Sequence, residues 1–328
     1  MQDEQTVRVR SLDEADIGSE WAATFDAYWP SYRRWFLSEG EAARPTYLAC
    51  ARAFKQHMPE LFDLYERAVT LAGGSDLTAR FLSGYCPPAY IAGCSQAIFG
   101  ERLLIRNYDY SARFWDALIV RSAWRGRRVL GMSDSGWGLL DGVNEQGLAV
   151  SLAFGGRRVV GDGFGIPVVL RYVLEVCDHT ADAVDALRRV PVHMAYNVSV
   201  LDANGAFATL LLSPDRPPLV TERRVITNHQ ERVEWRRHAL ATGSVDRLRI
   251  LSAHVRSRDE TEARFVRRFL EPPVFSRKYP AGLGTLYTAV YRPSARSVSY
   301  LWPAHRWDAS LDGPLGGPLD IDYASNTS

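Results

Sequence analysis

The chain has 328 residues, of which 46% are hydrophobic, so it is long and apolar enough to bury a large core in one or two domains. Its 39 lysines and arginines nearly balance its 38 aspartates and glutamates, for a net charge of +1. A balanced charge leaves no basic excess for a nucleic acid or an anionic membrane, and we expect neither as a partner.

The amino-terminal sequence, MQDEQTVRVR, lacks the apolar core of a signal peptide, and no stretch of the chain has about eighteen consecutive uncharged apolar residues. We therefore expect a soluble, cytoplasmic protein. Residues 1–85 read as helices, because apolar residues recur at three- and four-residue spacing over residues 20–37 and 44–74. The second stretch ends at Gly73-Gly74, a typical helix stop.

After Pro87-Pro88 the pattern changes to short apolar or β-branched runs separated by turn residues. This pattern predicts antiparallel hairpins with strands at residues 94–99, 102–110, 116–124, 127–135, 137–143 and 148–154. Two helices are expected at residues 166–179 and 180–190, the second with Thr180 as its N-cap.

Strands are expected again at residues 196–214, as a hairpin about Asn204-Gly205, and at residues 218–230. Helices are expected at residues 231–243, 245–255 and 261–270, and a last hairpin at residues 284–303. The order predicts an α+β fold of antiparallel sheets covered by helices, rather than a doubly wound parallel sheet.

The four cysteines are too few and too irregularly spaced for a disulfide framework or a zinc site, so we expect no metal, and we expect no cofactor. Cys50 and Cys177 lie in apolar helical stretches, and Cys86 precedes two prolines in a rigid loop, so each is interpreted as structural. Cys94 remains as the candidate nucleophile. Ser135 is rejected for that role because its surroundings do not match the GxSxG pattern.

A catalytic cysteine needs a base or a positive neighbour, because a free thiol titrates near about pH 8.5. Cys94 has no histidine close to it in sequence. If the Gly93–Cys94 peptide bond is cut, the new α-amine of Cys94, with an ordinary pKa of about 7.7 to 8.0, becomes a base beside the thiol. Gly93 suits such a cut, because glycine tolerates a strained backbone and lets the thiol reach the preceding carbonyl.

From Cys94 onward the chain resembles the amino-terminal nucleophile (Ntn) hydrolases of the choloylglycine hydrolase and isopenicillin-N acyltransferase type. The resemblance rests on Gly-Cys at 93–94, Arg-Asn-Tyr-Asp at 106–109, Gly-Val-Asn-Glu-Gln-Gly-Leu-Ala-Val at 142–150, Ser-Pro at 213–214 and Val-Ile-Thr-Asn-His at 225–229. It implies a four-layer αββα sandwich over residues 94–328, preceded by a helical propeptide-like segment at residues 1–93. It also implies self-cleavage between Gly93 and Cys94, with the two fragments remaining associated.

The resemblance also implies roles for four residues. Cys94 is the nucleophile and its amine the base, Asp109 holds that amine, Arg106 sits near the thiol, and Asn228 donates to the oxyanion of the tetrahedral intermediate. Taken alone, Asp109 and Arg106 could form an ordinary surface ion pair, and Asn228 could cap a strand end. Because Arg106 and Asp109 are three residues apart, a bulge or strand end at Asn107-Tyr108 is expected to bring both to Cys94.

The sequence departs from the family pattern at two places. Ala153 stands where relatives place a second asparagine, and residues 282–284 stand where a basic residue is expected, so Arg277 and Lys278 are the candidates to substitute for it. The resemblance implies an amidohydrolase or acyltransferase that forms a Cys94 thioester with the acyl part of a small amide or thioester substrate. The alternative is a relative that never cleaves itself and serves as a binding or scaffold protein.

Overall fold

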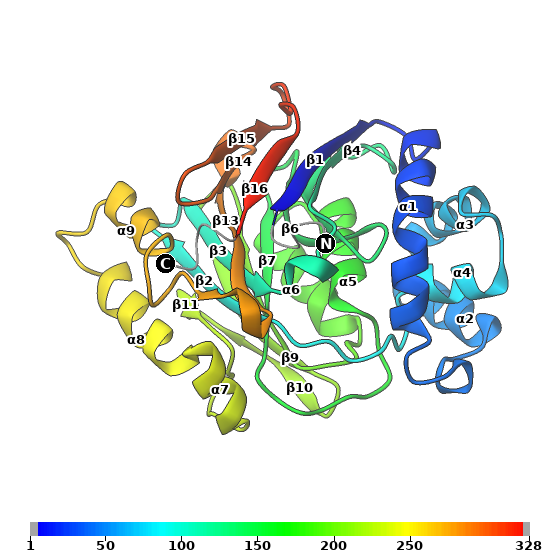
Figure 1. Ribbon diagram of the computed structural model, residues 1–328, viewed down its shortest axis with the longest axis horizontal. Coiled ribbons are helices and arrows are strands. Elements are labelled where there is room, and N and C mark those ends of the chain that lie inside the picture. Colours follow the sequence, from blue (N-terminus) through cyan, green and yellow to red (C-terminus); the bar gives the residue numbers. More distant parts are fainter. Residues whose placement is uncertain (1–5, 324–328) are drawn as a thin grey trace.

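Two β-sheets packed face to face form the centre of the molecule, in a computed structural model that describes residues 6–323 (Figure 1). The strands of the larger sheet, in spatial order, are β10 (Arg216–Thr221), β9 (Phe207–Ser213), β8 (Tyr196–Leu201), β7 (Ala149–Phe154), β6 (Gly138–Asn144), β5 (Val129–Asp134), β4 (Leu118–Ser122), β1 (Thr6–Glu14) and β16 (Leu319–Asp322). The smaller sheet has the order β11 (Val225–Ile226), β2 (Gly93–Phe99), β3 (Leu103–Tyr110), β13 (Leu283–Arg292), β14 (Ser297–Leu301) and β15 (Arg306–Ser310), and β12 (Arg277–Lys278) pairs with β13.

Helices cover the outer faces of both sheets. On the larger sheet, α5 (Ile166–Val176) packs against β6 and β7, and α6 (Thr180–Arg189) packs against β9 and β10. On the smaller sheet, α8 (Ser244–Val255) packs against β2 and β11, flanked by α7 (Arg236–Thr242) and α9 (Glu262–Arg268). The inner faces meet where β2 and β3 contact β7 and β8. The predicted αββα arrangement of antiparallel sheets covered by helices is therefore confirmed.

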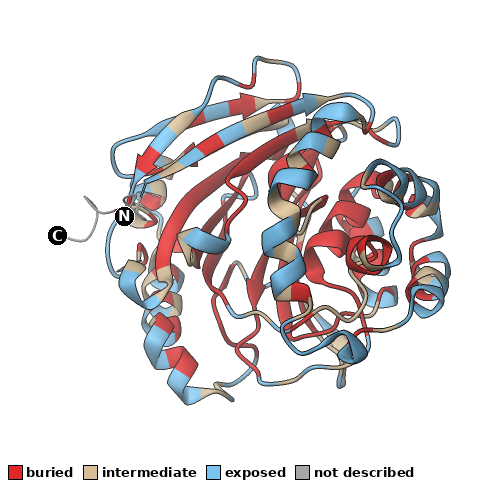
Figure 2. Cartoon of the chain, turned by 45° about the vertical axis from the view of Figure 1, so that its right-hand side comes forward, coloured by how far each residue is buried: buried red, intermediate tan, exposed pale blue. Residues whose placement is uncertain are grey.

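The central strands are buried on both faces, as Figure 2 shows. All seven residues of β2 are buried, because one face meets the larger sheet and the other meets α8. A second apolar cluster, which includes Ile105, Leu251 and Phe265, fills the space between the smaller sheet and its helices. Polar side chains within β2 and β3 are consequently held away from bulk water.

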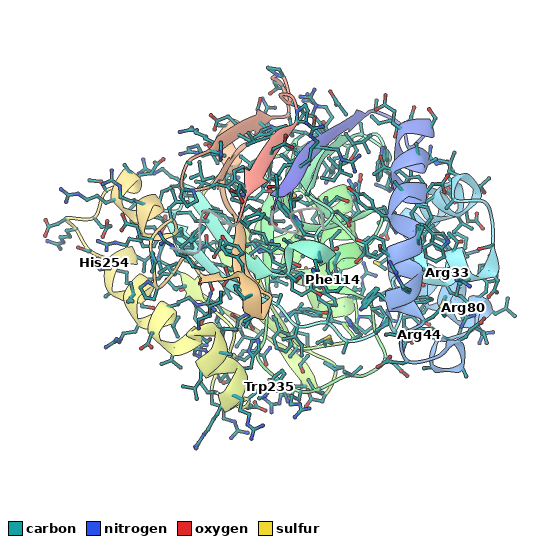
Figure 3. All side chains as sticks on the ribbon, viewed as in Figure 1. Arg33, Arg44, Arg80, Phe114, Trp235 and His254 are labelled. Atoms are coloured by element: carbon teal, nitrogen blue, oxygen red, sulfur yellow. The ribbon has the colours of Figure 1, made fainter. Side chains whose placement is uncertain are left out.

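The segment before Gly93 forms a helical group at one side of the larger sheet, made of α1 (Ser19–Phe36), α2 (Tyr47–His57), α3 (Phe62–Leu71) and α4 (Asp76–Leu82) (Figure 1). Arg80 ties this group together, since its Nε donates to the Pro45 carbonyl at 2.8 Å and its Nη1 to Glu41 Oε1 at 3.0 Å. Figure 3 shows Arg80 on this side of the molecule, close to Arg44.

Several elements differ from the predictions. Residues 6–14, expected within a helical segment, form strand β1, which pairs in parallel with β4 and antiparallel with β16. The N-cap of α6 is His179 rather than Thr180, whose hydroxyl instead donates to the Ala206 carbonyl at 2.7 Å. Strands β15 and β16 were not predicted: β15 pairs with the preceding strand β14, whereas β16 pairs with β1 at the other end of the chain.

Candidate active site

Cys94 is the second residue of β2, and the antiparallel ladder with β3 places Gly93 opposite Asp109 and Cys94 opposite Tyr108. Side chains alternate between the faces of a strand, and directly paired residues share a face. The Cys94 thiol therefore projects between the two sheets, whereas Asp109 projects toward the helical layer. The Gly93–Cys94 backbone is thus flanked by the thiol on one face of the sheet and by the Asp109 carboxylate on the other.

Arg106 lies on the thiol side, with its Nη2 3.7 Å from Cys94 Sγ. The side chain is fully buried and donates from Nε to the Leu152 carbonyl at 2.9 Å. Its Nη1 forms an ion pair with Asp141 and donates to the Tyr287 hydroxyl at 2.7 Å. These contacts hold a positive charge in place beside the sulfur.

Asp109 lies on the other face, where its Oδ2 accepts from Arg247 Nη1 at 2.8 Å and its Oδ1 accepts from the Thr285 hydroxyl at 2.6 Å. A Cβ added to Gly93 would lie 2.9 Å from Asp109 Cβ and 3.1 Å from its Oδ2. The missing side chain at position 93 therefore leaves space for the carboxylate next to the Gly93–Cys94 peptide bond.

The expected bulge at Asn107-Tyr108 is not what positions these groups, because the β2–β3 register runs without a shift. The irregularity lies in the neighbouring strand β13, between Thr285 and Tyr287. The prediction that a bulge turns Arg106 and Asp109 to one side is therefore wrong. They remain on opposite faces, one beside the thiol and one beside the backbone that carries it.

Asn228 follows β11, the strand that pairs with β2, and so reaches the backbone of Cys94. Its Oδ1 accepts from the Cys94 backbone N–H at 2.9 Å, and its Nδ2 donates to the carbonyls of Phe154 at 3.1 Å and Ala92 at 3.4 Å. Gly156 permits this approach, since a Cβ there would lie 2.0 Å from the Asn228 carbonyl oxygen. The amide thus spans both sides of the Gly93–Cys94 bond.

Arg247 of α8 is a site residue that sequence reasoning missed. It is 1% exposed, and it donates to Asp109, to Ser95 Oγ at 2.8 Å and to Asn228 Oδ1 at 2.7 Å. Its spacing with Leu251 and Val255 puts an arginine on the buried face of an amphipathic helix, which was the available signal.

Two basic residues were named from the sequence as candidates to replace the one expected at residues 282–284, and neither is buried. Arg277 and Lys278 are exposed in β12, and Lys278 Nζ donates to the Ala241 carbonyl at 2.6 Å. The buried cation beside Asp109 is Arg247 of α8.

Residues 99–307 match the family model of acyl-coenzyme A:6-aminopenicillanic acid acyl-transferase, which is 209 of the 328 residues (307 − 99 + 1 = 209). The chain belongs to this family. The match confirms the resemblance predicted from sequence, although the matched residues begin after the Gly93–Cys94 bond. No curated protein matches the chain.

Solved structures similar to this acyl-transferase family member share little sequence with it. A mutant of the conjugated bile acid hydrolase from Clostridium perfringens is 13% identical, with a TM-score of 0.49 over 72% of this chain and 98% of that one. An N-acylethanolamine-hydrolyzing acid amidase ortholog from Caenorhabditis elegans is 17% identical, with a TM-score of 0.45 over 62% and 93%. The penicillin V acylase from Agrobacterium tumefaciens is 16% identical, with a TM-score of 0.44 over 70% and 91%.

Ala153, the residue that sequence analysis placed at the position of a second asparagine, is buried. Ala153 of β7 pairs with Asn197 of β8, and its side chain has no donor for an oxyanion. Asn197 instead donates to the carbonyls of Thr227 at 2.9 Å and His229 at 3.2 Å. These carbonyls flank Asn228, so Asn197 holds the loop that presents it.

The environment of Cys94 favours the neutral thiol over the thiolate. Burial raises the pKa of the Cys94 thiol, and the opposing charge of Arg106 does not overcome this effect. Burial also raises the pKa of Asp109, although Arg247 lowers it.

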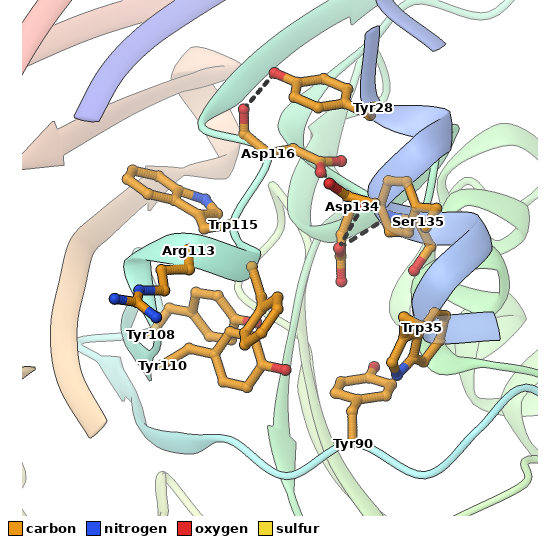
Figure 4. Close-up of a pocket in the computed structure, with 13 residues that line it drawn as sticks. Tyr28, Trp35, Tyr90, Tyr108, Tyr110, Arg113, Trp115, Asp116, Asp134 and Ser135 are labelled. Carbon is orange, nitrogen blue, oxygen red and sulfur yellow. Dashed lines mark hydrogen bonds between the residues drawn. The ribbon is translucent and has the colours of Figure 1, made fainter. Parts of the chain in front are cut away.

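A cavity of about 200 Å³ opens on the thiol side of the smaller sheet (Figure 4). Tyr108, which lies opposite Cys94 and beneath the Arg106 guanidinium at 4.7 Å from ring centroid to Cζ, lines it. Trp115 lines it too and stacks on Tyr287, which accepts a hydrogen bond from Arg106. One wall of the cavity, Tyr108, therefore contacts the arginine beside the sulfur, and a second wall, Trp115, reaches that arginine through Tyr287.

The part of the chain that the structure describes contains no group of three or more histidine, cysteine, aspartate or glutamate side chains arranged to hold a metal ion. Within the same residues, no helix combines the length and apolar character needed to cross a bilayer.

Proposed function

We propose that this protein is a self-processing cysteine Ntn enzyme that hydrolyses or transfers the acyl group of a small amide or thioester. One observation supports this most. The residue after Gly93 combines a thiol beside Arg106 with a backbone nitrogen bound by Asn228, and Asp109 lies across from Gly93.

Self-cleavage starts when Cys94 Sγ attacks the carbonyl carbon of Gly93. The carbon–nitrogen bond breaks, the departing nitrogen takes up the thiol proton, and Gly93 is left as a thioester on Cys94. Water then hydrolyses this thioester, which releases the Gly93 carboxylate and leaves Cys94 with a free thiol and a free α-amine.

In turnover, the α-amine takes the thiol proton and the thiolate attacks the substrate carbonyl. The amine next gives its proton to the leaving amine of an amide substrate, and an acyl-Cys94 thioester remains. Water completes a hydrolysis, and a second amine completes an acyl transfer. Arg106 favours the thiolate, because an adjacent positive charge lowers the pKa of a thiol.

In this proposal Asn228 first binds the backbone around the Gly93–Cys94 bond and, after cleavage, donates to the oxyanion. Its Oδ1 holds the nitrogen of Cys94, and its Nδ2 now donates to Ala92 and Phe154. Departure of the carbonyl of Ala92 after cleavage frees Nδ2 to donate to the tetrahedral intermediate, which is the step where such a donor has its effect. Arg247 acts as a positioning residue that holds Asp109 and Asn228.

Cleavage divides the chain into residues 1–93 and 94–328, and we propose that the two fragments stay together. The pairing of β1 with β4 and β16 supports this association. A cytoplasmic location belongs to the same proposal, since Cys50, Cys86, Cys94 and Cys177 are all free thiols, as expected in a reducing compartment.

The test is the intact mass of the purified protein. Cleavage yields fragments of 93 and 235 residues (328 − 93 = 235), and Cys94→Ala keeps one chain of 328. Cys50→Ala, which removes another fully buried thiol, is the matched control and still cleaves. A wild-type protein that stays whole at neutral pH contradicts self-processing and favours the non-cleaving binding protein.

A further inference from the structure

The cavity beside Tyr108 combines aromatic walls with two carboxyl groups. Eight of its thirteen lining residues are aromatic, and Asp116 and Asp134 also line it. Asp116 is 8% exposed, so its carboxyl group is nearly removed from bulk water. Aromatic faces and carboxylates share one preferred ligand, a positively charged group.

Asp116 and Asp134 lie close enough together to share one hydroxyl group. The Tyr32 hydroxyl lies 2.6 Å from Asp116 Oδ1 and 3.1 Å from Asp134 Oδ1. A hydroxyl has a single proton, so it donates to only one of the two acceptors at a time. The backbone N–H of Ser135 donates to Asp134 Oδ1 at 2.9 Å. With both carboxyls ionised, the site holds two like charges close together, on either side of one shared hydroxyl.

The pKa values follow the same logic. Burial raises the pKa of Asp134 to about 6, and burial together with the Asp134 charge raises the pKa of Asp116 well above its usual range. Arg10 and Arg106 oppose these shifts only in part. An additional cation between the carboxyls compensates both charges.

A second, independent feature of the cavity is an unused donor. The indole N–H of Trp115 is buried and has no acceptor among the described residues, although the side chain is only 7% exposed. In Figure 4 the nitrogen-bearing edge of this indole is turned toward the drawn side chains. A carbonyl oxygen on a bound molecule is the kind of acceptor it lacks.

Arg113 also lines the cavity, but its guanidinium points away from Asp116 and Asp134 in Figure 4. Arg113 therefore does not lie against these two carboxyl groups. The acidic end of the cavity lies where Tyr32 of α1 meets Asp116, shortly before β4, and Asp134, the last residue of β5, so both sides of the Gly93–Cys94 bond contribute to it.

We propose that this cavity binds an ammonium group, so that the substrate is an amide or thioester carrying a positive charge. This rests on the proposed function for the reaction, whereas the binding site itself does not depend on it. The aromatic walls surround the cation, Asp116 and Asp134 neutralise it, and Trp115 donates to a carbonyl of the same molecule. A cavity of about 200 Å³ suits a small aminoalkyl group better than a whole drug-sized ligand.

The first experiment measures binding without catalysis. Cys94→Ala protein is titrated calorimetrically with n-butylammonium and with pentan-1-ol, a neutral probe of similar size. We expect the ammonium to bind at least about 10-fold more tightly. Asp134→Asn and Asp116→Asn in the same background should each reduce ammonium affinity by about 10-fold or more. Asp185→Asn, an exposed residue of α6, is the control and leaves the affinity unchanged.

Equal affinity for the two probes, or ammonium affinity unchanged in both carboxyl variants, overturns the proposal. Both variants are expected to fold, because an amide avoids the cost of a buried charge, and far-UV circular dichroism checks this. Failure of wild-type self-cleavage with ammonium binding intact rejects the proposed function alone. Loss of ammonium selectivity with cleavage intact rejects only this inference.

A second experiment locates the charge in the substrate. Cleaved wild-type protein is offered 4-aminobutyryl anilide, with the ammonium on the acyl part, and N-acetyl-1,4-diaminobutane, with the ammonium on the amine part. Hydrolysis of either over its uncharged isostere supports the proposal and identifies the part that carries the charge. Preference for both uncharged isosteres overturns it.

Discussion

Replacing Arg247 by methionine should damage self-cleavage more than it damages the fold. Arg247 is buried with Asp109 at 1% and 3% side-chain exposure, and it also holds Asn228. Removing one partner of a buried ion pair costs about 3–5 kcal/mol of unfolding free energy. The pKa of Asp109, already raised by burial, rises further without Arg247, so the carboxyl takes up a proton. A shift of about 1 Å in such groups is enough to slow a reaction about 100-fold.

The matched control is Arg171→Met. Arg171 of α5 pairs with Glu175 at 1% and 0% exposure, so its loss should cost a similar free energy without touching the site. Stability is compared by urea unfolding in the Cys94→Ala background, where no chain is cleaved, and cleavage is followed in freshly synthesised protein on denaturing gels. Two variants that lose equal stability and slow cleavage equally would refute a positioning role for Arg247.

Three further outcomes are expected. Gly156→Ala should slow cleavage on the order of 10- to 100-fold by displacing Asn228, whereas Gly73→Ala, with the same kind of positive φ but no atom within 4 Å of the new Cβ, should cleave normally on the same gels. Iodoacetamide at about pH 7 should label Cys94, by peptide mass mapping, only after cleavage, because burial raises the thiol pKa in the intact chain; labelling of intact precursor there would contradict this. Because burial raises the pKa of Asp134 to about 6, the carboxyl group stabilises the folded state fully below its ordinary pKa of about 3.8, and this stabilisation is lost as the pH rises through about 6. The melting temperature of Asp134→Asn relative to wild type should therefore increase across this pH range. A difference that stays constant with pH would contradict this prediction.

The residues of the hairpin were predictable because their information is local. Once β2 and β3 pair across the turn at Gly100-Glu101, the register brings Arg106 and Asp109 to Cys94 without help from the rest of the fold. Arg247 was missed because its periodicity indicates a buried arginine but not the sheet against which that face packs. The orientation of Asp109 was also missed, since a spacing of three residues says nothing about which face of the strand the chemistry uses.

The structure of the N-terminal segment was the hardest to predict, because it depends on contacts with residues far away in the sequence. β1 alternates Val7 and Val9 with charged residues, yet the hydrogen-bond partners of this strand lie more than a hundred residues away, in β4 and β16. Helical periodicity in the following residues was correctly interpreted, and the strand ahead of it was included in the same helical segment by extension. Which roles the four predicted site residues play in catalysis stays a prediction.

The position of β1 has a consequence for how this protein must be made. In Figure 1 it lies between β4 and β16, and β16 reaches the larger sheet only through it. A gene that begins at Cys94 would leave two strand edges of the product without their neighbour, and such bare edges pair with other chains and precipitate. Supplying the first 93 residues later, as a separate peptide, would require a strand to enter a sheet that had already closed around other contacts. Synthesis as one continuous polypeptide avoids both difficulties, and under the proposed self-cleavage the larger sheet would have to form before the Gly93–Cys94 bond is cut.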